Sequence, residues 1–133
     1  MLSDPEVEAL VLVAAEARRH AYAPYSGFRV GAAVVADDDT VYAGCNVESA
    51  SYGLSLCAER SAIARAIAAG RTSVRAVVVV SEAGPDGTPC GACRQWLAEF
   101  GRDDLEVVCA AGIGERRVHR LADLLPHPFR LPR

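Results

Sequence analysis

The stretch Val74–Val80, which reads VRAVVVV, decides the fold class of this chain. A short run that is apolar at nearly every position and rich in β-branched residues is typical of a strand buried on both faces of a sheet. Strong helix formers fill residues 57–69 before it, and Gly70 provides a helix stop. A second helical segment, residues 90–100, and a second buried strand, residues 105–110, follow it. Strands and helices that alternate in this order usually form parallel pairs.

The residues before position 50 predict a helix followed by a hairpin. Residues 4–6, Asp-Pro-Glu, have the features of a helix start: a capping side chain in Asp4, a proline in the first turn and an acidic residue. Apolar side chains recur at helical spacing from there to about Ala21. Residues 28–36 and 40–47 then predict two strands, and the turn of three aspartates between them predicts a hairpin.

Together these segments predict an α/β fold of three layers, α/β/α, with a mixed sheet of about five strands between the helices. A short strand near Val118 and a terminal helical turn through Leu125 complete the prediction. The chain contains no internal repeat and no low-complexity linker, so residues 1–133 are predicted to form a single domain.

Composition and charge exclude several classes of function. The chain has 133 residues, of which 51% are hydrophobic and 23% charged, a balance typical of a globular protein. Its formal net charge is −3, which argues against nucleic acid as a partner because phosphate binding needs a concentrated basic surface. All 14 positive residues are arginine, so mechanisms that require a Schiff-base or phosphate-binding lysine are excluded.

The sequence predicts no membrane attachment, because no apolar run reaches the roughly 18 residues that a transmembrane helix needs. Acidic residues at positions 4, 6 and 8 stand where a signal peptide would be basic, so we expect a cytoplasmic protein. The five cysteines are an odd number, and two of them make a Cys-x-x-Cys pair. In a reducing compartment such a pair indicates metal or redox chemistry rather than a disulfide framework.

Three cysteines have the spacing of a catalytic zinc site. Cys57 opens one predicted helix, and Cys90 and Cys93 open another, where backbone amides favour thiolate over thiol. Because Cys90 and Cys93 are three residues apart, both sulfurs can reach one tetrahedral ion from a single turn, with Cys57 as the third ligand. Three protein ligands leave the fourth position of zinc open, which distinguishes catalytic from structural sites. We therefore expect one zinc ion per chain.

Glu59 is the candidate catalytic residue. It lies two positions past Cys57, close enough to exchange protons with a water that zinc activates, without binding the metal itself. A lone Cys-x-x-Cys would equally suit a redox pair or buried thiols. The combination of Cys-Ala-Glu with Pro89-Cys90-x-x-Cys93 matches the signature of zinc deaminases.

The sequence also resembles one family, the short homotetrameric cytidine deaminases, from about Ala21 to Phe129. The matching segments are Tyr22–Ser26, Phe28–Ala33, Gly44–Glu48, Cys57–Arg60, Pro89–Gln95, Leu124–Pro126 and Phe129. The resemblance implies a cytidine deaminase-like fold and zinc-dependent hydrolysis of cytidine and 2'-deoxycytidine to uridine and 2'-deoxyuridine with release of ammonia, as part of pyrimidine salvage. It also implies a homotetramer whose sites lie at subunit interfaces.

The resemblance assigns substrate contacts to six residues. Asn46 and Glu48 would bind the ribose, and alternation along a strand end would point both side chains to one face. The Ala58 amide would contact the base. Phe28 would pack on the pyrimidine ring, Tyr52 would lie near the substrate, and Phe129 would reach into a neighbouring subunit's pocket. Without the resemblance, Glu48 would be read as a solvent-facing acid and the two phenylalanines as packing residues.

Arg60 is the candidate partner of the zinc ligands. Three thiolates on one zinc ion leave a net charge of about −1, which weakens the pull of the metal on its water. An adjacent arginine can donate hydrogen bonds to the sulfurs and reduce that excess, and the family uses the arginine after this glutamate in that way. A surface arginine is the alternative. The sequence departs from the family at Ser49, where asparagine is common.

Three other functions compete with cytidine deamination. The first is deamination of another cytosine compound, such as the antibiotic blasticidin S, by the same fold and motif. The second is editing of a polynucleotide, which the acidic balance disfavours. The third is a binding domain stabilised by zinc, which would need a fourth protein ligand from Cys45, Cys109 or a histidine.

Overall fold

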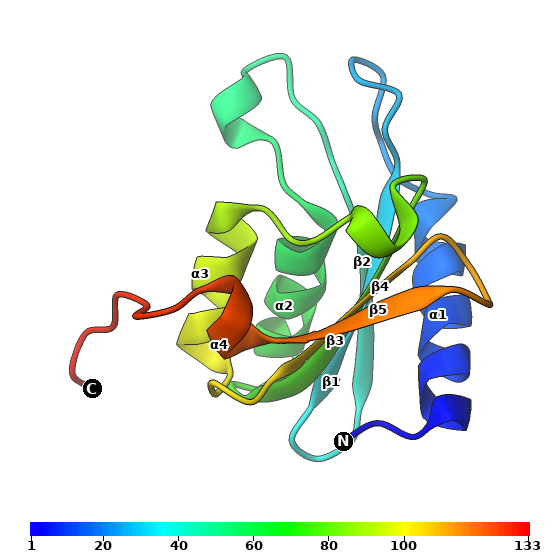
Figure 1. Cartoon of the computed structure of the whole chain (residues 1–133). Helices are drawn as coiled ribbons and strands as arrows, with labels where there is room; N and C mark the ends of the chain where they lie inside the picture. Colours follow the sequence, from blue (N-terminus) through cyan, green and yellow to red (C-terminus); the bar gives the residue numbers. More distant parts are fainter.

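A five-stranded sheet in the order β2-β1-β3-β4-β5 carries helices on both faces in a computed structural model that describes residues 1–133 (Figure 1). Strands β3 and β4 are parallel, and the other neighbouring pairs are antiparallel. Two short 3-10 turns cover Tyr52–Leu54 and Gly84–Asp86. The elements are α1 (Asp4–Arg18), β1 (Val30–Ala36), β2 (Val41–Cys45), α2 (Ala58–Ala68), β3 (Val74–Ser81), α3 (Gly91–Phe100), β4 (Glu106–Ala110), β5 (Arg116–Arg120) and α4 (Leu121–Leu124).

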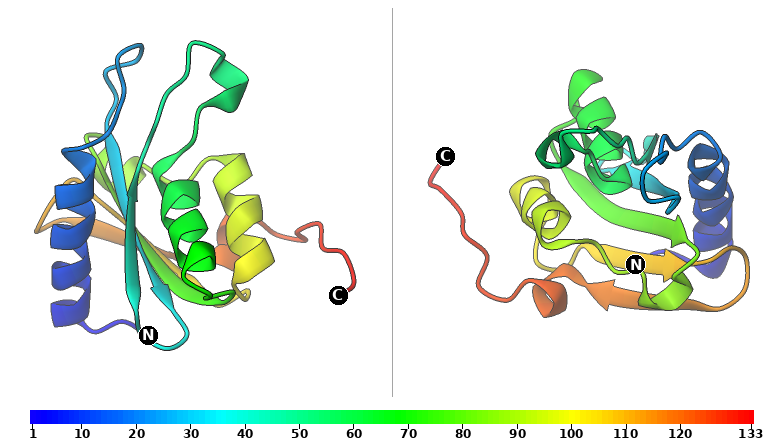
Figure 2. Two further views of the ribbon diagram at one scale, coloured as in Figure 1. Left: turned by 180° about the vertical axis from the view of Figure 1, so that it is seen from behind. Right: turned by 90° about the horizontal axis from the view of Figure 1, so that it is seen from above.

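The three-layer α/β prediction is confirmed. Helix α1 covers one face of the sheet, and α2 and α3 cover the other (Figure 2). Strand β3 lies at the centre of the sheet, and its valines alternate between the two layers. Val77 and Val79 join the core beneath α2 and α3, whereas Val78 and Val80 join the core beneath α1. Burial on both faces, at about 1.5–3 kcal/mol for each valine, explains why this strand is almost continuously apolar.

Two glycines bring helices into direct contact with the sheet. A Cβ atom on Gly31 of β1 would lie 1.9 Å from the Ala14 carbonyl oxygen of α1. A Cβ atom on Gly44 of β2 would lie 2.4 Å from the Ala62 amide nitrogen of α2. Neither distance is possible for a real side chain, so these positions fix how closely α1 and α2 approach the sheet.

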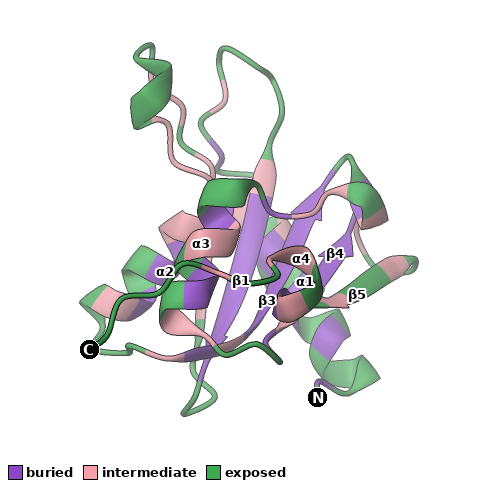
Figure 3. Cartoon of the chain, turned by 60° about the vertical axis from the view of Figure 1, so that its left-hand side comes forward, coloured by how far each residue is buried: buried purple, intermediate pink, exposed green.

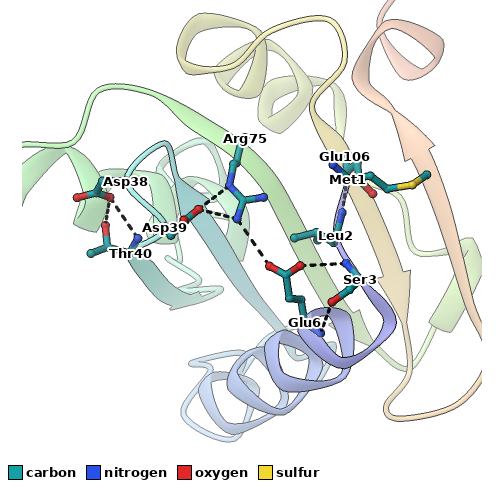
Figure 4. Close-up of polar contacts among 9 residues, drawn as sticks. All are labelled: Met1, Leu2, Ser3, Glu6, Asp38, Asp39, Thr40, Arg75 and Glu106. Atoms are coloured by element: carbon teal, nitrogen blue, oxygen red, sulfur yellow. Dashed lines mark hydrogen bonds and ion pairs between the residues drawn. The ribbon is translucent and has the colours of Figure 1, made fainter.

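Three details differ from the sequence-based prediction. Ser3, not Asp4, caps α1: Ser3 Oγ accepts the Glu6 amide at 3.3 Å, and Glu6 Oε1 accepts the Ser3 amide at 3.0 Å (Figure 4). The hairpin strands are shorter than expected, because residues 46–48 leave the sheet to pair with Tyr22 and Leu56. Trp96, which lies on the helix after the cysteine pair and which we would therefore expect in the core, is 37% exposed and contacts Phe100 edge to face.

The start of β1 and the ends of β2 and β3 lie at the same edge of the sheet. Val30 at the start of β1 pairs with Ser81 at the end of β3, and Gly31 pairs with Cys45 at the end of β2. The chain enters α2 and α3 beyond this edge. Residues 46–57 extend from it as a segment of exposed and half-buried residues, and most of the chain after α4 is exposed as well (Figure 3).

The aspartate turn between β1 and β2 lies at the opposite edge. Its residue Asp39 pairs with Arg75 at 2.7 Å, and Asp38 accepts hydrogen bonds from Thr40 (Figure 4). This turn is exposed, as the run of three acids predicts. No helix of the chain combines the length and the apolarity needed to cross a membrane.

Candidate metal centre and substrate pocket

Three thiols meet where α2 and α3 begin. Cys57 is the residue before α2, Cys90 is the residue before α3, and Cys93 lies in the first turn of α3. Their Sγ atoms all lie within 4.8 Å of one another, and those of Cys57 and Cys90 are 3.6 Å apart. Two sulfurs bound to one tetrahedral zinc at about 2.3 Å would be roughly 3.8 Å apart, so the spacing fits zinc. No fourth His, Cys, Asp or Glu joins this group.

Arg60 contacts the thiol cluster from the first turn of α2. Its Nη2 donates to Cys57 Sγ at 3.3 Å. Hydrogen bonding from the Cys93 thiol and then from Arg60 lowers the pKa of Cys57 to about 5. Donation to Cys57, followed by burial, raises the pKa of Cys93. The first negative charge of the metal-free cluster therefore resides on Cys57, and a bound divalent cation would deprotonate the remaining thiols.

Glu59 is the most buried carboxyl group of the site, at 4% exposure. Burial, and to a smaller extent the charge of Cys57, raises the pKa of Glu59 to about 7. A carboxyl group with this pKa can both take and give a proton near neutral pH. The carboxyl group of a surface glutamate would instead be ionised at neutral pH.

A cavity of about 380 Å³ opens beside the thiols. Its lining joins Phe28 and Asn46 to Ala58 and Glu59, although 12 and more positions separate these groups along the chain. A larger cavity of about 570 Å³ lies between α1, β2 and α2, away from the thiol cluster. The smaller one is lined by Ser26, Phe28, Val30, Asn46, Glu48, Cys57, Ala58, Glu59, Val79, Ser81, Gly87, Thr88 and Cys90.

Hydrogen bonds hold the side chains of Asn46 and Glu48, which line this cavity, in place. Asn46 Oδ1 accepts the Val30 amide, and Asn46 Nδ2 donates to the Phe28 carbonyl oxygen, both at 2.8 Å. Glu48 Oε1 accepts the amides of Tyr25 at 3.0 Å and Ser26 at 3.1 Å. The Ser26 hydroxyl donates to Glu48 Oε2 and lowers the pKa of Glu48. Both predicted ribose residues are thus preorganised, although they lie in a loop rather than at the end of a strand.

Two of the predicted substrate residues lie outside the cavity. Tyr52 is 76% exposed on its 3-10 turn and stacks edge to face with Tyr25. Phe129 is 69% exposed beyond α4, where Gln95 Nε2 donates to its carbonyl oxygen at 2.7 Å. Neither residue lines the cavity of its own chain.

Sequence reasoning did not single out several residues that line the cavity. Val79 and Ser81 come from the end of β3, and Gly87 and Thr88 come from the loop before α3. Ser26 falls in a matching segment of the resemblance, but only the folded chain shows its hydroxyl against Glu48. The only signal in the sequence was the position of these residues at a strand end or beside Pro89.

Comparisons with known proteins agree with this geometry. The family model described as the cytidine and deoxycytidylate deaminase zinc-binding region matches residues 5–111. The chain is 42% identical over 124 residues to a cytidine deaminase from Sporosarcina psychrophila, covering 93% of this chain and 91% of the relative. It is 43% identical over 118 residues to a cytidine deaminase from Mycobacterium tuberculosis, covering 89% and 85%.

Solved structures give the same result. The crystal structure of a cytidine deaminase from Burkholderia pseudomallei superposes with a TM-score of 0.87 at 50% identity, covering 96% of this chain and all (100%) of the other. That of a cytidine deaminase from Mycobacterium tuberculosis has a TM-score of 0.81 at 42% identity, covering 92% and 96%. The matches span most of each chain and include the thiol cluster. The chain therefore belongs to the cytidine and deoxycytidylate deaminase family.

Proposed function

We propose that this chain catalyses the hydrolytic deamination of cytidine and 2'-deoxycytidine to uridine and 2'-deoxyuridine, with release of ammonia, and that it serves pyrimidine salvage. The observation that carries the proposal is the position of the buried Glu59, which lines the cavity beside the cluster of three thiols. Its carboxyl group has a pKa of about 7 and can therefore act as an acid and as a base. The high identity to cytidine deaminases over almost the whole chain supports the same reaction.

The catalytic end of the cavity combines metal ligands with a proton carrier. Cys57, Cys90 and Cys93 would hold one zinc ion per chain. A zinc ion bound there would lower the pKa of water and so supply the nucleophile for C4 of the cytosine ring. Glu59 takes the proton that the attacking water loses and delivers it to ring N3. Glu59 then takes the proton of the new C4 hydroxyl and delivers it to the departing amine, so that the C4 carbonyl forms as the C4–N4 bond breaks and ammonia leaves. Ala58 lines the same cavity, and its amide would position the base.

The opposite end of the cavity selects a nucleoside. Phe28 packs on the pyrimidine ring, while Asn46 and Glu48 bind the ribose hydroxyls. Glu48 is held as a carboxylate by three hydrogen bonds and keeps free lone pairs with which to accept from the sugar. A bare cytosine base lacks these contacts, so we expect it to be a poor substrate.

Arg60 adjusts the charge at the metal. Its hydrogen bond to Cys57 draws negative charge away from the sulfur, which leaves more of the charge of zinc to act on water. The role is electrostatic, since Arg60 does not line the cavity.

We further propose that the protein is a homotetramer in the cytoplasm, with Phe129 reaching into a neighbouring subunit's pocket and Tyr52 lying at the same junction. Both side chains are exposed in the single chain, and reduced thiols suit a reducing compartment. Sedimentation equilibrium should give a mass near four times 14.1 kDa. Phe129→Ala should raise KM for cytidine, and a wild-type monomer with full activity would contradict this part.

The test of the reaction is the loss of ultraviolet absorbance when zinc-loaded protein meets a substrate panel. We expect turnover of cytidine and 2'-deoxycytidine, little turnover of cytosine, and release of one ammonia per nucleoside consumed. Blasticidin S and a single-stranded oligodeoxynucleotide belong in the panel as the competing substrates. Turnover of either one without turnover of cytidine would overturn the proposal.

A further inference from the structure

Arg94 immediately follows Cys93 on α3, and its side chain turns back towards the segment before the helix. Its Nε donates to the Pro89 carbonyl oxygen at 2.7 Å, and its Nη2 donates to Thr88 Oγ1 at 3.1 Å. Its Nη1 donates to the Leu124 carbonyl oxygen of α4 at 2.7 Å. All three guanidinium nitrogens are therefore engaged, and each one reaches a different residue.

These bonds act on the residues that deliver a thiol to the metal centre. The amide of Arg94 also donates to the Cys90 carbonyl oxygen at 2.9 Å, so backbone and side chain together hold residues 88–90. Thr88 and Cys90 line the substrate cavity, whereas Arg94 does not. The groups are partly buried, and hydrogen bonds from a charged donor are stronger there than neutral ones.

We infer that Arg94 is a positioning residue that fixes residues 88–90 to α4, and thereby sets the place of the Cys90 thiol and of the Thr88 wall of the cavity. It acts through these neighbours and does not touch the substrate. The catalytic part of this inference rests on the proposed function. Its metal-binding part can be tested whether or not cytidine is the substrate.

The chemistry of the contact requires arginine. A planar guanidinium presents N–H groups in several fixed directions, which matches three acceptors on two different segments. A lysine ammonium is a single nitrogen and could keep at most part of this arrangement. Arg65 provides a matched control because it also donates from a helix to a backbone carbonyl, that of Ala43, at 2.8 Å, but lies away from the thiols.

The first experiment measures how fast folded, zinc-loaded protein releases zinc to a colorimetric chelator. Arg94→Gln should release zinc faster than wild type, by about 10- to 100-fold if the release rate carries the loss of metal affinity that removal of an outer partner typically causes. Arg94→Lys should fall between the two, and Arg65→Gln should match wild type. Unchanged release from the Arg94 variants, or equal acceleration in Arg65→Gln, would overturn the inference. Arg94→Lys preserves the test if Arg94→Gln does not fold.

The second experiment asks whether Arg94 acts through Thr88. Thr88→Val removes one acceptor, and its effect on KM for cytidine is compared in the wild-type and Arg94→Lys backgrounds. If Arg94 positions Thr88, Thr88→Val should raise KM for cytidine clearly less in the Arg94→Lys protein than in the wild-type protein. Additive effects would contradict this step. If wild-type protein does not deaminate cytidine at all, the proposed function fails, while zinc release still decides the role of Arg94.

Discussion

Ser26 donates its hydroxyl hydrogen to the Glu48 carboxylate and so joins the loop before β1 to the segment after β2. The same hydroxyl accepts the Phe28 amide at 3.0 Å. One small side chain thus links the carboxylate proposed to bind ribose with the ring proposed to pack on the base. The bond stabilises the ionised form of Glu48, which is why its pKa lies below the ordinary value.

Ser26→Ala should raise KM for cytidine and make it more sensitive to acid. Because the wild-type pKa of Glu48 is lowered, its carboxylate persists as pH falls through the ordinary pKa of 4.5. Without the Ser26 donor the pKa should rise, so the ribose contact should be lost at a higher pH. KM measured from about pH 8 down to that ordinary value tests this. 2',3'-Dideoxycytidine lacks the 3'-hydroxyl and serves as the control substrate. Identical KM profiles for the two proteins would refute the link.

Glu59→Gln should retain zinc and lose turnover by orders of magnitude, because the amide cannot carry a proton. The same variant reports on stability. The pKa of Glu59 rises from 4.5 to about 7 on folding, so the stability that protonated Glu59 provides is fully present below about 4.5 and is lost as pH rises through 7. Relative to Glu59→Gln, metal-free wild type should lose on the order of 3 kcal/mol across that range.

Urea unfolding of both metal-free proteins at about pH 5 and pH 8, under reducing conditions, gives this difference, because those values bracket the Glu59 transition. The comparison cancels the opposite contribution of Cys57, whose lowered pKa both proteins share. Equal pH dependence in the two proteins would show that Glu59 is not the group that titrates, and near-normal turnover would remove it from the mechanism.

Arg60→Gln should keep the fold and reduce turnover about 10- to 100-fold, because the thiolates would hold more charge against the metal. In the metal-free protein the change should raise the pKa of Cys57, since Arg60 is one of the donors that hold it at about 5. The rate of alkylation by iodoacetamide as a function of pH measures that shift, with Arg65→Gln as the control. An unchanged alkylation profile would exclude the contact as a source of thiolate stability.

Gly44→Ala should destabilise the protein and weaken its hold on zinc. The added Cβ would lie 2.4 Å from the Ala62 amide nitrogen and 2.7 Å from the Ala58 carbonyl oxygen, so α2 must move outward. Because α2 carries Glu59 and follows Cys57, the metal centre moves with it. We expect a loss of about 1–3 kcal/mol or more, as overpacking typically costs. Gly112→Ala, which meets nothing within 4 Å, is the control for thermal melting and zinc content.

Local patterns in the sequence predict the fold and the thiol cluster well. The valine-rich strand is recognisable because burial on two faces leaves no polar position, and Cys90 and Cys93 are recognisable because ligands on one turn require fixed spacing. The positions of Asn46 and Glu48 could not be read in this way. Their segment leaves the sheet because the intervening Val47 pairs with Leu56, a contact that depends on the folded chain.

Contacts that join distant segments were beyond sequence reasoning for the same reason. The hydroxyl of Ser26 meets Glu48 across 22 positions, and Arg94 meets Leu124 across 30. Neither contact can be predicted from the periodicity of the sequence. Tyr52 and Phe129 are a different case. Both are exposed in the single chain, and the hydrophobic pattern that predicts the core of one chain does not predict residues proposed to act between subunits.

The aspartate turn between β1 and β2 offers a point of attachment. It lies at the edge of the sheet opposite the thiols, and its contacts are exposed ion pairs and local hydrogen bonds that contribute little to stability. Exposed turns of this kind accept inserted peptides readily. An affinity tag placed between Asp38 and Asp39 should therefore tether the enzyme to a resin with its cavity facing the solution and its turnover intact.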